Sequence, residues 1–129
     1  MKRLFFFFAA LTITIGSSNA QTITNKTTCD IVVDVACELP QPGCWYNIIA
    51  TIYIASGATM PFPMCSSGVA SELLLHFYYD NGCSADDPYV GLPGNCFGFP
   101  QDEVMHSSCD VCTSPAKITY LGGFDWEVY

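Results

Sequence analysis

The sequence predicts an all-β fold, a small disulfide-stapled antiparallel β-sandwich with a long irregular loop region. Three observations support this prediction. Apolar and polar residues alternate with a period of two along residues 29–37, as they do in a half-buried strand. Glycine and proline interrupt the chain after each apolar segment. Eight cysteines, all beyond the N-terminal apolar segment, are typical of a small domain that folds in an oxidising compartment.

The N-terminus has the features of a secretory signal peptide. A basic head is followed by a twelve-residue apolar run and then by small residues ending at Ala20. Twelve residues cover only about half of the hydrocarbon core of a bilayer, so a membrane span is not expected. We therefore predict a signal peptide over residues 1–20, cleavage before Gln21, and one β-sandwich domain over residues 21–129. The mature protein is expected to be secreted, into the periplasm or the extracellular space.

Removal of the signal makes the protein more acidic. Lys26 and Lys117 then stand against all twelve Asp and Glu residues, which gives a net charge of −10. Such a charge disfavours nucleic acid and other polyanionic partners. Two lysines and no arginine also equip the mature chain poorly to hold an anionic substrate.

Two apolar segments, residues 29–37 and 44–55, predict a β-hairpin. Between them lie two prolines and a glycine, which neither strand can accommodate. The second segment is apolar enough to be covered on both faces. The register that aligns the apolar faces pairs Cys37 with Cys44, Val35 with Tyr46, Val33 with Ile48 and Ile31 with Ala50. It predicts a Cys37–Cys44 disulfide.

The middle of the chain carries weaker signals. Pro61 and Pro63 place residues 59–64 at a sheet edge. Apolar residues within 69–79 have helical spacing from Ala70 to Tyr78, but the aromatic end of the segment and the Asp-Asn-Gly turn after it favour a strand. Residues 82–115 are broken repeatedly by glycine and proline, so disulfides are expected to order them.

The C-terminal segment predicts a second hairpin. We expect a three-residue loop over residues 121–123, with Gly123 in a left-handed conformation. The resulting register pairs Tyr120 with Phe124, Ile118 with Trp126, Ala116 with Val128 and Lys117 with Glu127.

The cysteines are read as disulfide staples: Cys29, Cys37, Cys44, Cys65, Cys83, Cys96, Cys109 and Cys112. His106, Cys109 and Cys112 follow one another at three-residue intervals, a spacing that metal sites use, and Cys109 with Cys112 could form a redox pair. An even number of cysteines in an exported chain favours staples instead. We expect no metal and no cofactor.

No motif indicates a catalytic site. Acidic residues in the loops could bind calcium or serve as a glycosidase pair, but their spacing matches neither an EF-hand nor a defined acid–base pair: Asp80, Asp86, Asp87, Asp102 and Glu103. They are expected to be solvated loop charges. His76 and His106 are expected to be structural, because no nucleophile motif accompanies them. The protein is therefore predicted not to be an enzyme.

Aromatic residues are the remaining candidates for ligand binding. Phe97 and Phe99 lie in a glycine-rich loop, and Trp45 and Trp126 lie on predicted strands. Exposed rings on a β-scaffold can stack on sugars or dock a protein. Alternatively, the two tryptophans fill the small core.

A further motif concerns modification. Asn25-Lys26-Thr27 matches a glycosylation acceptor, but the predicted signal resembles a bacterial export signal, so the acceptor is expected to be unused.

These observations favour a secreted non-catalytic β-sandwich that acts as an extracellular binding or surface-assembly protein, with protein or carbohydrate at the cell surface as its partner. A small carbohydrate-binding module, calcium-assisted or not, is the first alternative, and a small extracellular hydrolase that uses loop carboxylates is the second. The sequence leaves the ligand and the oligomeric state open.

Overall fold

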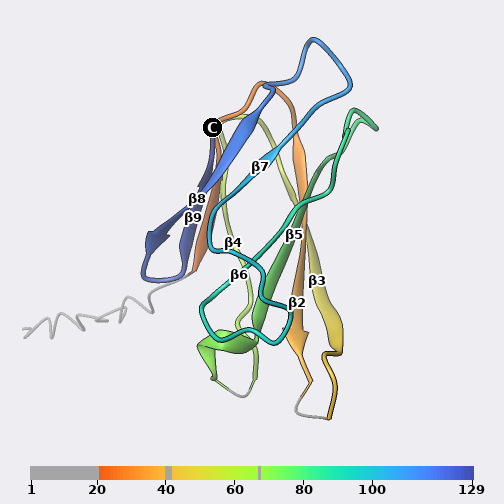
Figure 1. Cartoon of the computed structure of the whole chain (residues 1–129). Coiled ribbons are helices and arrows are strands. Elements are labelled where there is room, and N and C mark those ends of the chain that lie inside the picture. The colour runs from red at the N-terminus through yellow and green to blue at the C-terminus, as the bar shows by residue number, and fades with distance from the viewer. Residues whose placement is uncertain (1–20, 40–41, 67) are drawn as a thin grey trace, which may run out of the picture.

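The computed structural model describes residues 21–39, 42–66 and 68–129, which form two β-sheets packed face to face (Figure 1). The five-stranded sheet has the order β4 (Thr59–Pro61), β1 (Thr22–Asn25), β9 (Asp125–Val128), β8 (Ala116–Gly122) and β7 (Glu103–Met105). The four-stranded sheet has the order β3 (Tyr46–Ile54), β2 (Ile31–Glu38), β5 (Leu73–Tyr79) and β6 (Tyr89–Gly91). Neighbouring strands are antiparallel except for β1 and β9. The predicted disulfide-stapled sandwich is confirmed.

Two predictions fall on parts of the chain outside the described residues. These are the signal peptide, residues 1–20, and part of the turn between β2 and β3, residues 40–41.

The core lies between the sheets and follows the predicted alternation. On β2, Ile31, Val33 and Val35 are fully buried, and they belong to the same apolar cluster as Ile118 and Trp126 of the opposite sheet. Burial of such side chains stabilises the fold by about 25 cal/mol for each Å² of apolar surface removed from water.

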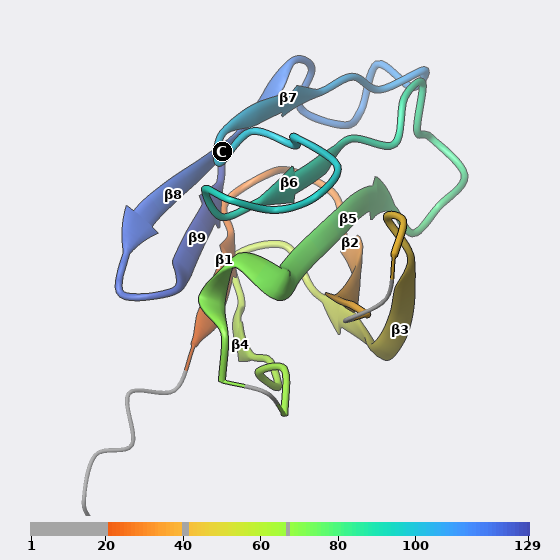
Figure 2. The same ribbon diagram turned by 60° about the horizontal axis from the view of Figure 1, so that its bottom comes forward.

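The positions of β2 and β3 within their sheet differ from the prediction. β2 lies between β3 and β5, and even its outward-facing Val32 and Ala36 are buried. β3 was expected to be covered on both faces, yet it is the edge strand of its sheet and is exposed along most of its length (Figure 2). Apolar composition alone therefore indicated β3 as the covered strand, whereas β2 is the strand covered on both faces.

The register of this hairpin also differs from the prediction. Ile31, Val33 and Val35 lie opposite Ile54, Ile52 and Ala50, four residues further along β3 than expected. A bulge follows, after which the strands pair as far as Glu38 and Tyr46. A shift by an even number of residues keeps the same apolar faces together, so the alternation could not distinguish the two registers.

The predicted Cys37–Cys44 disulfide is wrong for the same reason. In the observed register Cys37 lies opposite Asn47, and Cys44 precedes the start of β3. The cysteines instead form four disulfides: Cys29–Cys112, Cys37–Cys65, Cys44–Cys96 and Cys83–Cys109. All eight predicted staple cysteines are thus disulfide-bonded.

The C-terminal hairpin forms with a different loop. Gly123 and Phe124 both have positive φ, 60° and 68°, so the loop is a two-residue turn of the kind that matches strand twist. A bulge at Leu121 absorbs the extra residue. The register is consequently shifted by two, and it pairs Tyr120 with Trp126, Thr119 with Glu127 and Ile118 with Val128. Glu127 binds Lys26 (2.8 Å) rather than the predicted Lys117.

The remaining elements agree with their predictions. A 3-10 turn, Ala70–Glu72, leads into β5, so residues 69–79 end in a strand and not a helix. β4 is a short edge strand, as its prolines require. Residues 82–115 contain only two three-residue strands. The disulfides Cys44–Cys96 and Cys29–Cys112 attach this region to the rest of the domain, and Cys83–Cys109 closes a loop within it.

Two observations concern the environment of the chain. Within the described residues, no helix is both long and apolar enough to cross a membrane. Four disulfides in so small a domain indicate an oxidising, extracellular environment.

Candidate binding surface

The two tryptophans have opposite environments. Trp126 is 1% exposed in the core, packs against Phe62 and Tyr120, and donates its indole N–H to the Gln101 carbonyl (3.2 Å). Trp45 is 66% exposed just before β3. Of the two tryptophans among the four predicted aromatic candidates, only Trp45 is therefore available to a ligand.

Four rings form a continuous stack on the outer side of the four-stranded sheet. We call it the ring stack, and it consists of Phe97, Phe99, Tyr89 and His76. The successive ring centroids are 5.4, 5.0 and 4.3 Å apart, and the interplanar angles are 5°, 16° and 11°. Each ring thus covers the face of its neighbour. A sugar stacks on the face of an aromatic ring, so the inner faces of this stack are not open to it.

The loop that carries Phe97 and Phe99 is held by polar contacts as well as by a disulfide. The Asn95 side chain, which is 9% exposed, donates to the carbonyls of Leu92 and Phe99 and accepts from the Phe99 N–H, all within 2.9 Å. Asn95 lies against Gly91, where a Cβ would come within 3.0 Å of the Asn95 amide nitrogen. These contacts therefore stabilise the conformation of the loop.

A second group of contacts attaches this loop to the β2–β3 hairpin. Cys96 is bonded to Cys44, and its backbone N–H donates to a Glu38 carboxylate oxygen (2.5 Å). The ring of Tyr46 on β3 meets Phe97 edge to face at 5.5 Å. Loop and hairpin thus form one unit around the ring stack.

Within the ring stack, the hydroxyl of Tyr89 keeps its proton to high pH. A hydrogen bond to the Tyr46 hydroxyl, together with burial, raises the pKa of Tyr89 to about 12. Next to the stack, the Asp34 carboxylate accepts from Thr51 (2.6 Å) and lies 3.4 Å from the His76 ring nitrogen. This acid therefore has polar partners on both neighbouring strands.

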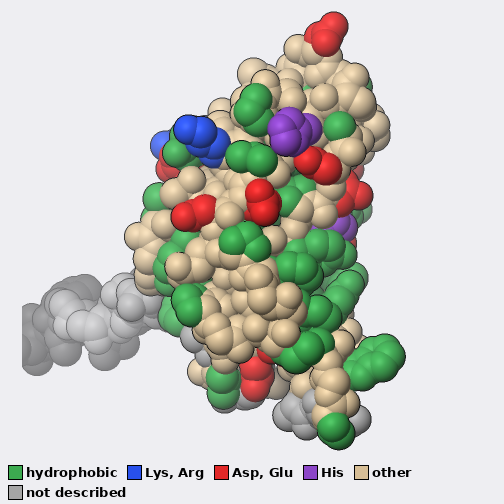
Figure 3. Space-filling view, in the orientation of Figure 1, with side chains coloured by type: hydrophobic (Ala, Val, Ile, Leu, Met, Phe, Trp, Pro, Cys, Tyr) green, Lys and Arg blue, Asp and Glu red, His purple; other side chains and the backbone are tan. Residues whose placement is uncertain are grey.

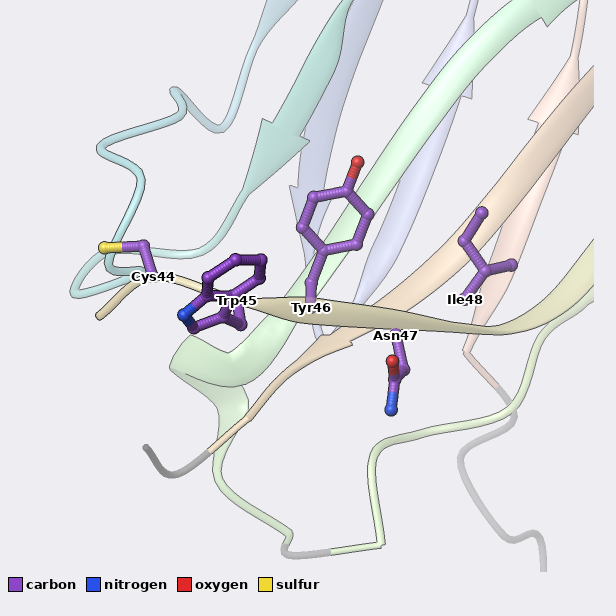
Figure 4. A pocket seen from close by; sticks show the side chains of 5 residues that line it. All are labelled: Cys44, Trp45, Tyr46, Asn47 and Ile48. Atoms are coloured by element: carbon purple, nitrogen blue, oxygen red, sulfur yellow. The ribbon is translucent and has the colours of Figure 1, made fainter. Parts of the chain in front are cut away.

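Exposed apolar residues concentrate next to the ring stack. Among the described residues, eleven large hydrophobic side chains are exposed, and five of these lie within residues 45–53. We call these five the β3 surface: Trp45, Tyr46, Ile48, Ile49 and Tyr53. Hydrophobic side chains gather at the lower right of the space-filling view, where β3 lies in Figure 1 (Figure 3). A shallow hollow borders the start of the strand, where Tyr46 and Ile48 point to one side and Asn47 to the other (Figure 4).

A charge pattern that our sequence reasoning missed marks the same region. Residues 39–71 contain no Asp, Glu, Lys, Arg or His, although the chain has a net charge of −8. β3 and β4 both fall inside this uncharged run. Surface strands normally carry charged residues, so this run was the available signal for an unusual surface.

The predicted chemical alternatives do not assemble into a site. Cys109 and Cys112 belong to two different disulfides, which rules out their joint use as a redox pair. His106 binds Asp86 through its ring (2.7 Å), and both side chains are exposed. No group of three His, Cys, Asp or Glu in the described part of the chain could hold a metal ion.

The loop acids likewise have local roles. Asp86 and Asp102 accept backbone N–H groups of His106 and Tyr120, each at 2.6 Å, and Glu103 accepts from Val104. These contacts order the loops.

Asn25 of the acceptor motif is fully buried. Its amide nitrogen donates to the carbonyls of Cys29 and Ile54, each at 2.9 Å. Its oxygen accepts from the Thr27 N–H and hydroxyl. The folded domain therefore has no space for a glycan on this side chain.

Comparisons with protein-family models, with curated proteins and with solved structures found no match.

Proposed function

We propose that this protein is a secreted, non-catalytic binding protein that docks another protein on the β3 surface. The observation that carries the proposal is the combination of five exposed apolar side chains with an uncharged strand at a sheet edge. Exposed apolar clusters of this kind mark interaction sites in soluble proteins. The predicted signal peptide and the four disulfides support secretion to the periplasm or the extracellular space.

A protein partner fits this surface better than a small ligand does. The hollow beside Trp45 and Tyr46 is lined by consecutive residues of one segment, so it offers a flat contact and not an enclosing cleft. An edge strand also presents backbone N–H and C=O groups that an extended segment of a protein can pair with. Apolar side chains on the strand then add specificity.

Photo-crosslinking tests this proposal in the producing cells. Tyr53, which is 64% exposed, is replaced with p-benzoylphenylalanine in the full chain, and Leu121, which is 60% exposed on the other sheet, serves as the matched control. We expect a covalent adduct to a protein from position 53 and none from position 121. Absence of an adduct at position 53, or equal adducts at both positions, would refute docking on β3.

Carbohydrate binding is the second candidate, and the exposed face of Trp45 favours it. It is tested by retention of the mature protein on insoluble cellulose and chitin. A carbohydrate role predicts retention that Trp45→Ala abolishes and that Val111→Ala, a change at another exposed site, leaves intact. Docking of a protein predicts no retention on either polysaccharide.

A further inference from the structure

We infer that the partner on β3 is a second copy of this chain, whose β3 pairs antiparallel with the first and joins the two four-stranded sheets into one. This inference rests on the proposed function, because it names the partner of the same surface. It is carried by the state of the sheet edges, by the charge of the strand and by its register.

Three of the four edge strands in the described structure are blunted. β4 and β7 have three residues each; β4 ends in Pro61, and β7 begins with the charged Glu103. β6 also has three residues, and the N–H of its Gly91 donates to the Pro100 carbonyl (2.8 Å), so the following loop covers this edge. Short strands, proline, charge and coverage are the devices by which proteins prevent edge pairing.

β3 has none of these four devices, and its one protective feature is a β-bulge. It is nine residues long and contains neither proline nor a charged residue. At about 3.3 Å per residue it extends for about 30 Å. The bulge lies at Ile49, so residues 50–54 remain a regular strand that pairs without interruption with β2. An unprotected edge of this length is a template for another strand.

Charge selects the second copy as the occupant. The mature chain has a predicted net charge of −10, so contact between two copies is least unfavourable at a surface that brings no like charges close together. β3 is such a surface. The nearest acids on β2 are already held, Asp34 by Thr51 and Glu38 by the Cys96 N–H. A charged partner strand would find no counter-charge on β3, whereas a second β3 is uncharged and apolar in the same way.

The register of a symmetric pair is also favourable. A two-fold axis at Ile52 places Ala50 opposite Ile54, and Thr51 opposite Tyr53, of the second copy. Thr51 and Tyr53 both point to the outer side of the sheet, because they lie opposite Asp34 and Val32 of β2. Pairs of an aromatic and a β-branched residue stabilise antiparallel strands.

Sedimentation equilibrium of the mature chain, with its disulfides formed, tests this inference. The protein is sampled over a concentration range of about a hundredfold, and we expect the average mass to rise from that of the monomer toward that of the dimer. Tyr53→Lys places two lysines about 7–8 Å apart across the axis, and we expect it to raise the dimer Kd at least about tenfold. Leu121→Lys, the matched control, is expected to leave the Kd within about threefold.

A second variant guards against misfolding. Tyr53→Glu adds the opposite charge at the same exposed position and is expected to weaken the dimer as well, with unchanged circular dichroism. A monomer at every concentration, or a dimer that neither Tyr53 variant weakens, overturns the inference. The proposed function fails independently, by the absence of an adduct from position 53 in cells. An adduct from position 53 to a different protein overturns the inference alone.

Discussion

Truncation of the buried Asn25 side chain should destabilise the fold strongly. Asn25→Ala removes a donor from the carbonyls of Cys29 and Ile54 and an acceptor from the Thr27 N–H and hydroxyl. The Cys29 carbonyl keeps a hydrogen bond from the Thr27 hydroxyl, and the Ile54 carbonyl keeps its place opposite Ile31 in the β2–β3 ladder, so the main loss is at the Thr27 N–H. A buried polar group that loses its partner costs about 1–3 kcal/mol.

One such group predicts a loss of about 1–3 kcal/mol in the free energy of unfolding, which is substantial against the 5–15 kcal/mol of a typical domain. Urea unfolding of the mature, oxidised chain measures this loss. Thr24→Ala is the control on the same strand, and its exposed hydroxyl contact with Thr59 predicts a loss of about 0.2–1 kcal/mol. A loss for Asn25→Ala that is no larger than that of the control would refute the role of Asn25 as a buried hydrogen-bonding centre.

Three further predictions concern the ring stack and its loop. Replacement of both Cys44 and Cys96 by serine removes a disulfide that links residues 52 positions apart. We expect this change to lower the free energy of unfolding, measured in urea, by at most about 4 kcal/mol. An unchanged free energy of unfolding would contradict the attachment of the loop. Gly91→Ala places a methyl group within 3.0 Å of neighbouring side chains and is expected to cost about 1–3 kcal/mol in the same assay; a neutral effect would contradict this close approach. Because the pKa of Tyr89 is raised to about 12, the unfolded chain loses this proton first, and stability should fall as the pH rises from 10 to 12. Tyr46→Phe removes the main cause, so an ultraviolet titration should show the Tyr89 pKa moving down; an unchanged titration would contradict the hydrogen bond.

Local patterns in the sequence predicted the elements of the fold well. The alternation at Ile31, Val33 and Val35 identified the core face of β2, and Pro61 identified an edge strand. The glycines near the C-terminus located a hairpin. These signals reside in a few neighbouring residues, where steric rules and burial act directly.

Pairing between elements was predicted less well. The apolar faces of β2 and β3 coincide in several registers that differ by an even number of residues, and the turn between the strands decides among them. Because Cys37 and Cys44 followed the wrong register, their disulfide partners were wrong as well. Long-range disulfides depend on how the sheets pack, which no local pattern encodes.

The candidate surface was predicted only in part. Trp45 and the loop phenylalanines were singled out by residue type, and they lie on or beside β3. The exposure of β3 was not predicted, because a strand rich in apolar residues is usually covered on both faces. The absence of charge over residues 39–71 was present in the sequence and indicates the surface only when the strand is known to be an edge.

Amide hydrogen exchange tests the central claim most directly, because it reports on the backbone of β3 itself. The mature chain is compared at two concentrations about a hundredfold apart. We predict that the amides of Thr51 and Tyr53, which point away from β2, exchange more slowly at the higher concentration, while those of the edge strand β7 do not change. Equal exchange of the Thr51 and Tyr53 amides at both concentrations would contradict the pairing of β3 with a second copy.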